Sequence, residues 1–165
     1  MVASSCLQYT AMDLSGEHLA VAGRAGLALY SVGTRRWKLF GSESQERDII
    51  VSGGLLWWGS YVVLAAYSVA SDCDQLRLYP RDSKLDNSFA TVTKLPAQAL
   101  LLNILQDRLV TFCSDARVSI YALAMKDNVS SGKCKLAKRT NFLLTFKYCP
   151  RLLYLRDFVI FRFFR

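Results

Sequence analysis

The sequence has little of several residue types on which common sites and folds depend. Histidine occurs once, as His18, which excludes any site that needs two imidazoles. Three prolines and nine glycines in 165 residues exclude collagen-like and proline-rich chains. The five cysteines are odd in number and none stand in a Cys-x-x-Cys pair, so we expect neither a disulfide framework nor a zinc site. A reducing compartment fits this chain better than secretion.

Acidic residues are nearly missing from the last fifth of the chain. Residues 1–132 carry twelve Lys/Arg and twelve Asp/Glu, so their net charge is zero. Residues 133–165 carry nine Lys/Arg against the single acid Asp157, and this segment accounts for the whole net charge of +8. Because the basic charge belongs to one segment, we expect no nucleic-acid function.

Long apolar runs are also missing. No stretch offers about 20 uninterrupted apolar residues, so we expect no transmembrane segment. The N-terminus has no basic region followed by an apolar one, so we expect no signal peptide.

The sequence contains no recognisable catalytic or ligand-binding motif. The Gly53-Gly54 pair lacks the spacing of a dinucleotide loop, and neither a phosphate-binding loop nor a nucleophile elbow occurs. His18 has no evident nucleophile partner. The acids in 43–48 and 72–74 lie in polar loops, where we expect solvated surface rather than paired-acid catalysis. We predict no catalytic, cofactor-binding or metal-binding residues, and a chain that is not an enzyme by itself.

The residues that are present favour a single globular domain of short strands. Hydrophobic residues make up 52% of the chain and charged residues 21%, which is enough apolar mass for a core. Leu27–Val32 alternates in polarity, Gly33-Thr34 follows, and Arg35–Phe40 alternates again. Two alternating runs separated by a glycine turn predict a hairpin.

This pattern recurs along the chain. Alternating strands end in the pairs Leu29-Tyr30, Leu78-Tyr79 and Ile120-Tyr121, and the tyrosines are 49 and 42 residues apart. Units of about 40–50 residues made of short strands are typical of β-propeller blades. Runs such as Tyr61–Tyr67 are almost wholly apolar, as a sheet covered on both faces requires. An antiparallel sandwich with the same strand spacing is the alternative.

We therefore predict an all-β fold, an incomplete WD40-like β-propeller of about three blades over residues 10–126. Residues 1–9 form an N-terminal leader. A closed ring needs about four to eight blades, so the first and last blades would expose apolar faces.

Residues 127–165 break the strand pattern. Lys133–Thr140 is basic, and Asn141–Arg165 mixes Phe, Leu, Tyr and Arg without a clean period. We predict an irregular, basic, aromatic-rich tail. It is either a segment for a membrane surface or an anionic partner, or a chain end not selected for this fold.

Four residues are candidates for partner contact. Trp57 and Trp58 are adjacent on a predicted strand, so their rings face opposite ways and one could pack in each layer between blades. Alternatively, one ring is an exposed anchor for a partner. Arg35 and Arg36 either contact an acidic partner or form a charged hairpin surface.

Several short sequence motifs follow one another over roughly Thr10–Lys126. They are Trp37-Lys38-Leu39-Phe40-Gly41, Gly53-Gly54-Leu55 with Trp57-Trp58, Leu85-Asp86-Asn87 with Phe89-Ala90 and Val92-Thr93-Lys94, and Leu100-Leu101-Leu102 with Gln106-Asp107. In their order and spacing these motifs resemble the ribosome control protein family, the large β-propeller subunit of the Golgi guanine-nucleotide exchange complex for the Rab-six GTPase. The residues after about Asp127 do not match the family.

The resemblance implies a fragment or truncated homologue of a much longer protein, which has further blades and a C-terminal helical region. Family members pair with an arrestin-like partner subunit, promote GDP release from a Rab GTPase, and support endosome-to-Golgi retrograde transport. They are found in the cytosol and peripherally on the Golgi membrane, and the resemblance implies no cofactor and no catalytic residue. The alternative function is a WD40-like scaffold or interaction module with no exchange activity of its own.

Overall fold

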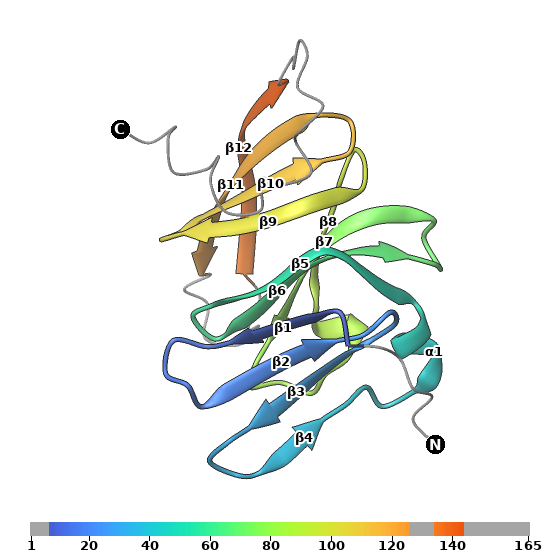
Figure 1. The fold of residues 1–165 in the computed structure, drawn as a ribbon, viewed down its shortest axis with the longest axis vertical. Coiled ribbons are helices and arrows are strands. Elements are labelled where there is room, and N and C mark those ends of the chain that lie inside the picture. The colour runs from blue at the N-terminus through green and yellow to red at the C-terminus, as the bar shows by residue number, and fades with distance from the viewer. Residues whose placement is uncertain (1–6, 126–133, 144–165) are drawn as a thin grey trace.

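Three antiparallel four-stranded sheets make up the computed structural model, which describes residues 7–125 and 134–143 (Figure 1). Within each sheet the strands lie side by side in chain order. The first sheet consists of β1 (Tyr9–Met12), β2 (His18–Ala22), β3 (Leu27–Ser31) and β4 (Arg36–Lys38). The second consists of β5 (Ile49–Trp58), β6 (Tyr61–Ser68), β7 (Cys73–Pro80) and β8 (Thr91–Lys94). The third consists of β9 (Ala99–Leu105), β10 (Arg108–Cys113), β11 (Arg117–Met125) and β12 (Cys134–Leu143).

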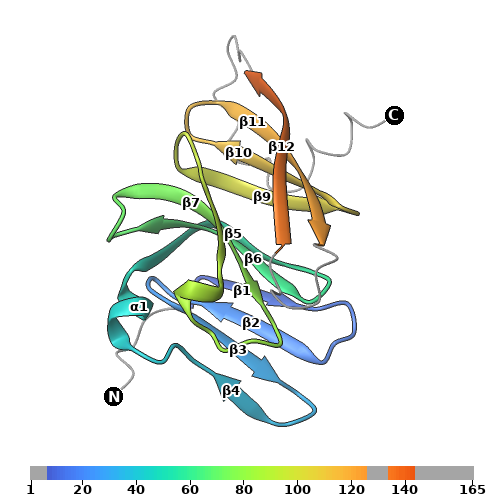
Figure 2. The same ribbon diagram turned by 180° about the vertical axis from the view of Figure 1, so that it is seen from behind.

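Two short helical segments flank the second sheet. The helix α1 (Glu43–Arg47) leads into β5, and the 3-10 turn η1 (Asn87–Phe89) lies between β7 and β8. The Ser42 side chain accepts a hydrogen bond from the Gln45 N–H and so caps α1. Figure 2 shows the two segments beside each other, where the Asn87 N–H donates to Gln45 Oε1 at 3.0 Å. Within the described ranges, the helices are too short or too polar to cross a bilayer.

The middle sheet is apolar on both faces because a core lies on each side of it. Along β6, Val62, Leu64 and Ala66 belong to the core shared with the first sheet. The alternate residues of β6 belong to the core shared with the third sheet, and they are Tyr61, Val63 and Ala65. Successive side chains on a strand point to opposite faces, so one continuous apolar run serves two interfaces.

The inner strands of the sheets approach each other closely. β5 contacts both β1 and β9, and its pairing with β6 shifts register between Val51 and Leu55. Gly53 and Gly54 lie in this bulge with φ of 73° and 143°. A Cβ atom at Gly53 would stand 2.4 Å from the Ala99 carbonyl oxygen of β9. Glycine at this position therefore lets the second and third sheets meet backbone to backbone.

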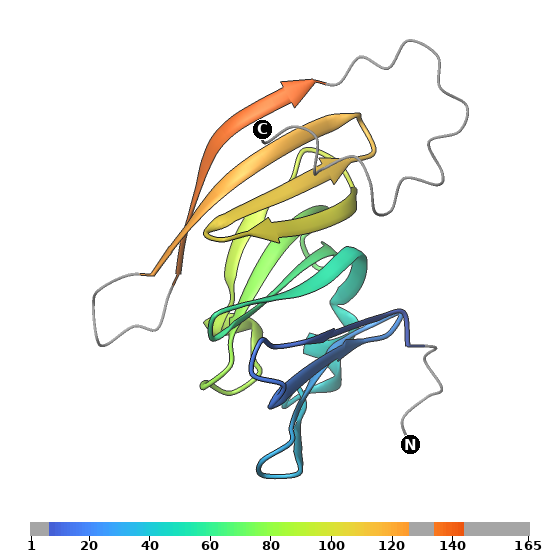
Figure 3. The ribbon, with the colours of Figure 1, turned by 60° about the vertical axis from the view of Figure 1, so that its left-hand side comes forward.

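This architecture confirms the predicted all-β arrangement of about three blade-like units. Three stacked sheets do not fit the sandwich alternative, which has two. The sheets do not close into a ring (Figure 3). The expected hairpin turns occur, and Gly26 and Gly59 have the positive φ that such turns favour. The first strand begins at Tyr9, one residue before the predicted start of the domain.

The predicted irregular tail over 127–165 is wrong for part of its length. Residues Cys134–Leu143 form β12, which pairs with β11 and completes the third sheet as its outer strand (Figure 3). The pairing shifts register between Ile120 and Tyr121, whose partners are Thr140 and Lys138, so Arg139 is an inserted residue. An inserted residue interrupts the two-residue period, which explains why no strand pattern was visible. The remaining tail positions lie outside the described residues.

Candidate protein-interaction surface

Trp57, at the end of β5, fills the layer between the first two sheets. It packs against the first core, and its Nε1–H donates to the Ala11 carbonyl oxygen of β1 at 3.0 Å. The His18 ring lies 6.1 Å from the Trp57 ring, tilted by 53°. The indole is half-buried, so it joins the two sheets near the surface.

Trp58 has the corresponding position in the layer between the second and third sheets. It packs against the second core beside Tyr61, with ring centroids 5.8 Å apart. Its Nε1–H donates to Asp107 Oδ1 at 3.1 Å, in the turn between β9 and β10. Packing between sheets, one indole in each layer as the alternation of the strand predicts, accounts for both rings.

Arg35 and Arg36 lie at the tip of the β3–β4 hairpin, and both are exposed. Arg35 has φ of 54°, as the turn requires. Within residues 7–124, neither guanidinium forms an ion pair with a carboxylate. This tip is therefore a charged projection of the first sheet.

A groove of about 460 Å³ between the first two sheets brings two of the four predicted residues together, Arg36 and Trp57. Lys38 and Arg81 also line it. Lys38 Nζ donates to the carbonyl oxygens of Arg81 at 2.5 Å and Ser83 at 2.8 Å, which ties the hairpin to the second sheet. Arg81 forms an ion pair with Asp82 at 2.9 Å. In the described part of the chain, neither Lys38 nor Arg36 forms an ion pair with a carboxylate, and Lys38 is held by its two carbonyl partners.

The β1–β2 turn leads into His18, which lines this groove, and the turn is organised by Asp13. Its Oδ1 accepts hydrogen bonds from the backbone N–H groups of Glu17 and His18, both at 3.0 Å, and its Oδ2 accepts one from the Ser15 hydroxyl at 2.7 Å. Burial raises the pKa of the Asp13 carboxyl, but the hydrogen bonds from Ser15, His18 and Glu17 outweigh that effect and lower it to about 2. The carboxylate therefore fixes the turn that places His18 against Trp57.

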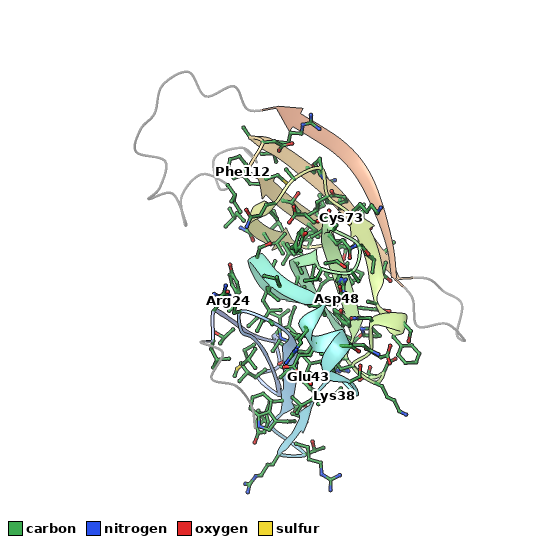
Figure 4. All side chains as sticks on the ribbon, turned by 90° about the vertical axis from the view of Figure 1, so that its right-hand side faces the viewer. Arg24, Lys38, Glu43, Asp48, Cys73 and Phe112 are labelled. Atoms are coloured by element: carbon green, nitrogen blue, oxygen red, sulfur yellow. The ribbon has the colours of Figure 1, made fainter. Side chains whose placement is uncertain are left out.

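The second sheet contains a buried polar network that was not predicted from the sequence. Asp48, expected in a solvated loop, instead forms an ion pair with the buried Arg77 at 2.7 Å, close to the end of α1 (Figure 4). The Arg77 Nε–H also donates to Gln75 Oε1, and the Tyr79 hydroxyl donates to Asn87 Oδ1. A charged residue in the centre of the apolar run Leu76–Tyr79 was the available signal.

The electrostatics of Asp48 follow from its surroundings. Burial raises the pKa of its carboxyl, but hydrogen bonds from the Ala70 N–H, Arg77 and Ser68 outweigh that effect and hold the pKa below its ordinary value. The ionised carboxylate then holds α1 and the β6–β7 connection against the second sheet, so the network serves the fold. Over the described ranges, no three His, Cys, Asp or Glu side chains cluster as a metal site would require.

Comparison with known proteins gives consistent relationships. The family of the RIC1 second β-propeller domain matches residues 4–151, which takes in part of the segment 127–165 that was expected to be unlike the family. The chain is 45% identical over 126 residues to the guanine nucleotide exchange factor subunit RIC1 of Mus musculus, covering 76% of this chain and 9% of that protein. It is 32% identical over 141 residues to the guanine nucleotide exchange factor subunit R06F6.8 of Caenorhabditis elegans, covering 84% and 9%.

The chain therefore spans about 9% of the length of these curated relatives. Among solved structures it is similar to Kluyveromyces lactis Hsv2 with a complete loop 6CD, with a TM-score of 0.51 and 16% identity. That similarity covers 85% of this chain and 37% of the other, and it bears on the fold alone.

Proposed function

Because the chain belongs to the family of the RIC1 second β-propeller domain, we propose that it acts as a propeller part of a guanine-nucleotide exchange complex. Its contribution is protein–protein contact rather than chemistry of its own. The observation that carries this proposal is the identity of 45% to a protein named as an exchange factor subunit. The middle sheet is covered on both apolar faces by its neighbours, and such a stack suits a rigid binding platform.

The GTPase of the proposed complex is a Rab protein, and the second subunit is an arrestin-like protein. The complex acts in endosome-to-Golgi retrograde transport, in the cytosol and peripherally on the Golgi membrane. These finer assignments rest on the family resemblance of the short sequence motifs around Trp37–Gly41 and Leu85–Lys94, and each of them can be tested.

An exchange factor accelerates GDP release because it binds the nucleotide-free GTPase more tightly than the loaded form. The coupling is reciprocal, so nucleotide weakens the complex by the same factor by which the complex weakens nucleotide binding. Such a mechanism needs surfaces that discriminate between two states of the GTPase, and it needs no cofactor or metal ligand from this chain.

The β3–β4 hairpin tip is the contact surface that we propose. Arg35 and Arg36 are exposed there, and neither is engaged by a carboxylate within residues 7–124. Trp57 and Trp58 pack between sheets, and Trp57 lines the groove together with Arg36 of this hairpin. An acidic surface on the partner subunit or the GTPase would complement the two guanidinium groups.

Reconstitution tests this proposal. The 165-residue chain is combined with the arrestin-like subunit and a Rab protein loaded with fluorescent GDP, and the release rate is measured. Changing Arg35 and Arg36 together to Glu is expected to weaken assembly by about tenfold or more, as loss of two contacts in an interface can. Arg24→Glu is the matched control, since Arg24 is exposed at the opposite end of the first sheet.

Three results would count against the proposal. GDP release unchanged by the wild-type chain would remove the exchange role. Equal effects of the Arg35/Arg36 pair and the Arg24 control would remove the hairpin tip as the contact surface. Binding to the partner subunit without any change in GDP release would favour the second candidate, a scaffold module.

A further inference from the structure

The layer between the first two sheets is open near the β5–β6 turn, and the groove of about 460 Å³ lies there. Leu29, inside this layer, belongs to the first core. Ser31 lies two residues further along β3, so it faces the second sheet as well. His18 and Arg36 are the cross-strand neighbours of Ser31 and share that face. One wall of the groove is therefore a polar row on the first sheet, and Trp57 of the second sheet lies in the other.

The next layer is closed at the equivalent place. Tyr61 begins β6 as His18 begins β2, and each side chain points toward the sheet that follows along the chain. Tyr61 is 7% exposed and packs beside Trp58 in the second core. The imidazole of His18 is smaller, and its side chain remains 22% exposed. The repeat therefore does not require an opening here, and the residues of the first layer create it.

The residues that line the groove carry a surplus of positive charge. They include Arg36, Lys38 and Arg81 against the carboxylate of Asp82. The ion pair of Arg81 with Asp82 cancels two of these charges. Lys38 is held by two carbonyl oxygens, and within the described residues neither Lys38 nor Arg36 forms an ion pair. Asp13, in the neighbouring turn, is occupied by hydrogen bonds from its own loop. In the described chain, two positive charges thus face the groove without a carboxylate partner.

We propose that the groove binds an acidic peptide segment of a partner protein. Arg36 and Lys38 lie two residues apart on β4 and face the same way, which separates them by about 7 Å along the strand. An extended peptide repeats its side chains on one face at the same spacing, so glutamates at alternate positions match the two cations. The side chain between them points to the opposite wall, where an apolar residue would cover the Trp57 ring.

The two walls together favour a peptide over a simple anion. A free phosphate would pair with the cations but leave the half-buried indole of Trp57 uncovered. The volume of about 460 Å³ is typical of sites that combine apolar contact with a few placed polar groups. The inference rests on the proposed function, because Arg36 belongs to the hairpin proposed as the contact surface. It adds the chemistry of the partner segment and the place where its carboxylates bind.

Fluorescence anisotropy of a labelled peptide of alternating glutamate and leucine, titrated with the full chain, tests the proposal. The same peptide with glutamine in place of glutamate should bind at least about tenfold more weakly. Arg36→Gln removes one of the two charges, and His18→Tyr closes the groove with the side chain that closes the next layer. Each should weaken binding of the acidic peptide by about tenfold. Arg24→Gln, at an exposed position outside the groove, is the matched control and should bind normally.

Arg35→Gln separates the groove from the hairpin tip, since Arg35 is at the tip but is not among the lining residues. It should weaken binding less than Arg36→Gln does, and an equal effect would assign the contact to the tip and overturn the proposal. Equal binding of the glutamine peptide, or unchanged binding by a His18→Tyr chain that circular dichroism shows to be folded, would also overturn it.

Two further comparisons separate the groove from other anions and from the exchange role. Inorganic phosphate or phosphatidylserine vesicles that displace the labelled peptide as well as unlabelled acidic peptide does would overturn the assignment to a peptide. If the wild-type chain accelerates GDP release but binds no acidic peptide, the groove assignment fails and the exchange role stands. Peptide binding that depends on Arg36 and His18, without any effect on GDP release, supports the groove and counts against the exchange role alone.

Discussion

Gly53→Ala tests most sharply how the second and third sheets meet. The substitution would place a methyl group 2.4 Å from the Ala99 carbonyl oxygen, which belongs to the backbone of β9 and cannot turn aside as a side chain can. It would also hold alanine at φ of 73°, which costs about 1–2 kcal/mol by itself. Moving β9 away would loosen the second core, at a cost of about 1–3 kcal/mol typical of overpacking.

The two costs together predict a loss of about 3 kcal/mol in the free energy of unfolding, or roughly 10 °C in melting temperature for a chain of this size. Urea unfolding followed by tryptophan fluorescence measures the loss directly. Trp57 and Trp58 lie in the two layers between sheets, so the tryptophan emission includes a signal from both layers.

Two glycines separate the backbone cost from the steric cost. Gly16 has φ of 73° but no atom within 4 Å of where a Cβ would lie, so Gly16→Ala should show the backbone cost alone, about 1–2 kcal/mol. Gly41 has neither a positive φ nor a near neighbour, so Gly41→Ala should change stability by less than about 0.5 kcal/mol. If Gly53→Ala destabilises the chain no more than Gly16→Ala does, the close approach of β5 and β9 does not exist in solution.

Three further perturbations address the layers, the buried ion pair and the turn. Trp57→Ala and Trp58→Ala should each lower the free energy of unfolding by about 2–3 kcal/mol, which is below the range for a fully buried tryptophan. An unchanged melting temperature together with lost partner binding would instead identify a contact residue. Arg77→Met leaves Asp48 without its partner and should lower the free energy of unfolding by about 3–5 kcal/mol. Adding Asp48→Asn removes the unpaired charge and should restore part of that loss. A double variant no more stable than Arg77→Met alone would contradict the network. Asp13, with a folded pKa of about 2 against an ordinary 3.8, stabilises the fold fully above about pH 4 and loses that contribution as the pH falls toward 2. The difference in unfolding free energy between wild type and Asp13→Asn should shrink over that range, and a constant difference would refute the assignment.

Local patterns in the sequence were sufficient to predict the number of sheets and most of their turns. The recurring tyrosines and the glycine turns predicted three units because each unit repeats the same local geometry. Four-residue strands such as β1 and β8 were not predicted individually because at least half of their residues are polar or small. Gly53-Gly54 was considered as a nucleotide-binding loop and rejected, and the structure places the pair in a bulge within β5.

The candidate surface could be predicted only in part. The opposite orientations of Trp57 and Trp58 follow from strand alternation, and the structure places one ring in each layer. The approach of Arg36 to Trp57 depends on how two sheets stack, which no local pattern encodes. The Asp48–Arg77 pair joins residues 29 positions apart, and sequence gives no means of matching such partners.

Hydrogen exchange of the backbone amides, followed by mass spectrometry, tests most directly whether the sheets are stacked as blades with the middle one covered on both sides. Strands covered on both faces open least often, so peptides from β6 should exchange slowest and peptides from β4 fastest among the strands. Exchange in β6 as fast as in β4 would contradict the stacked arrangement on which the proposed platform depends.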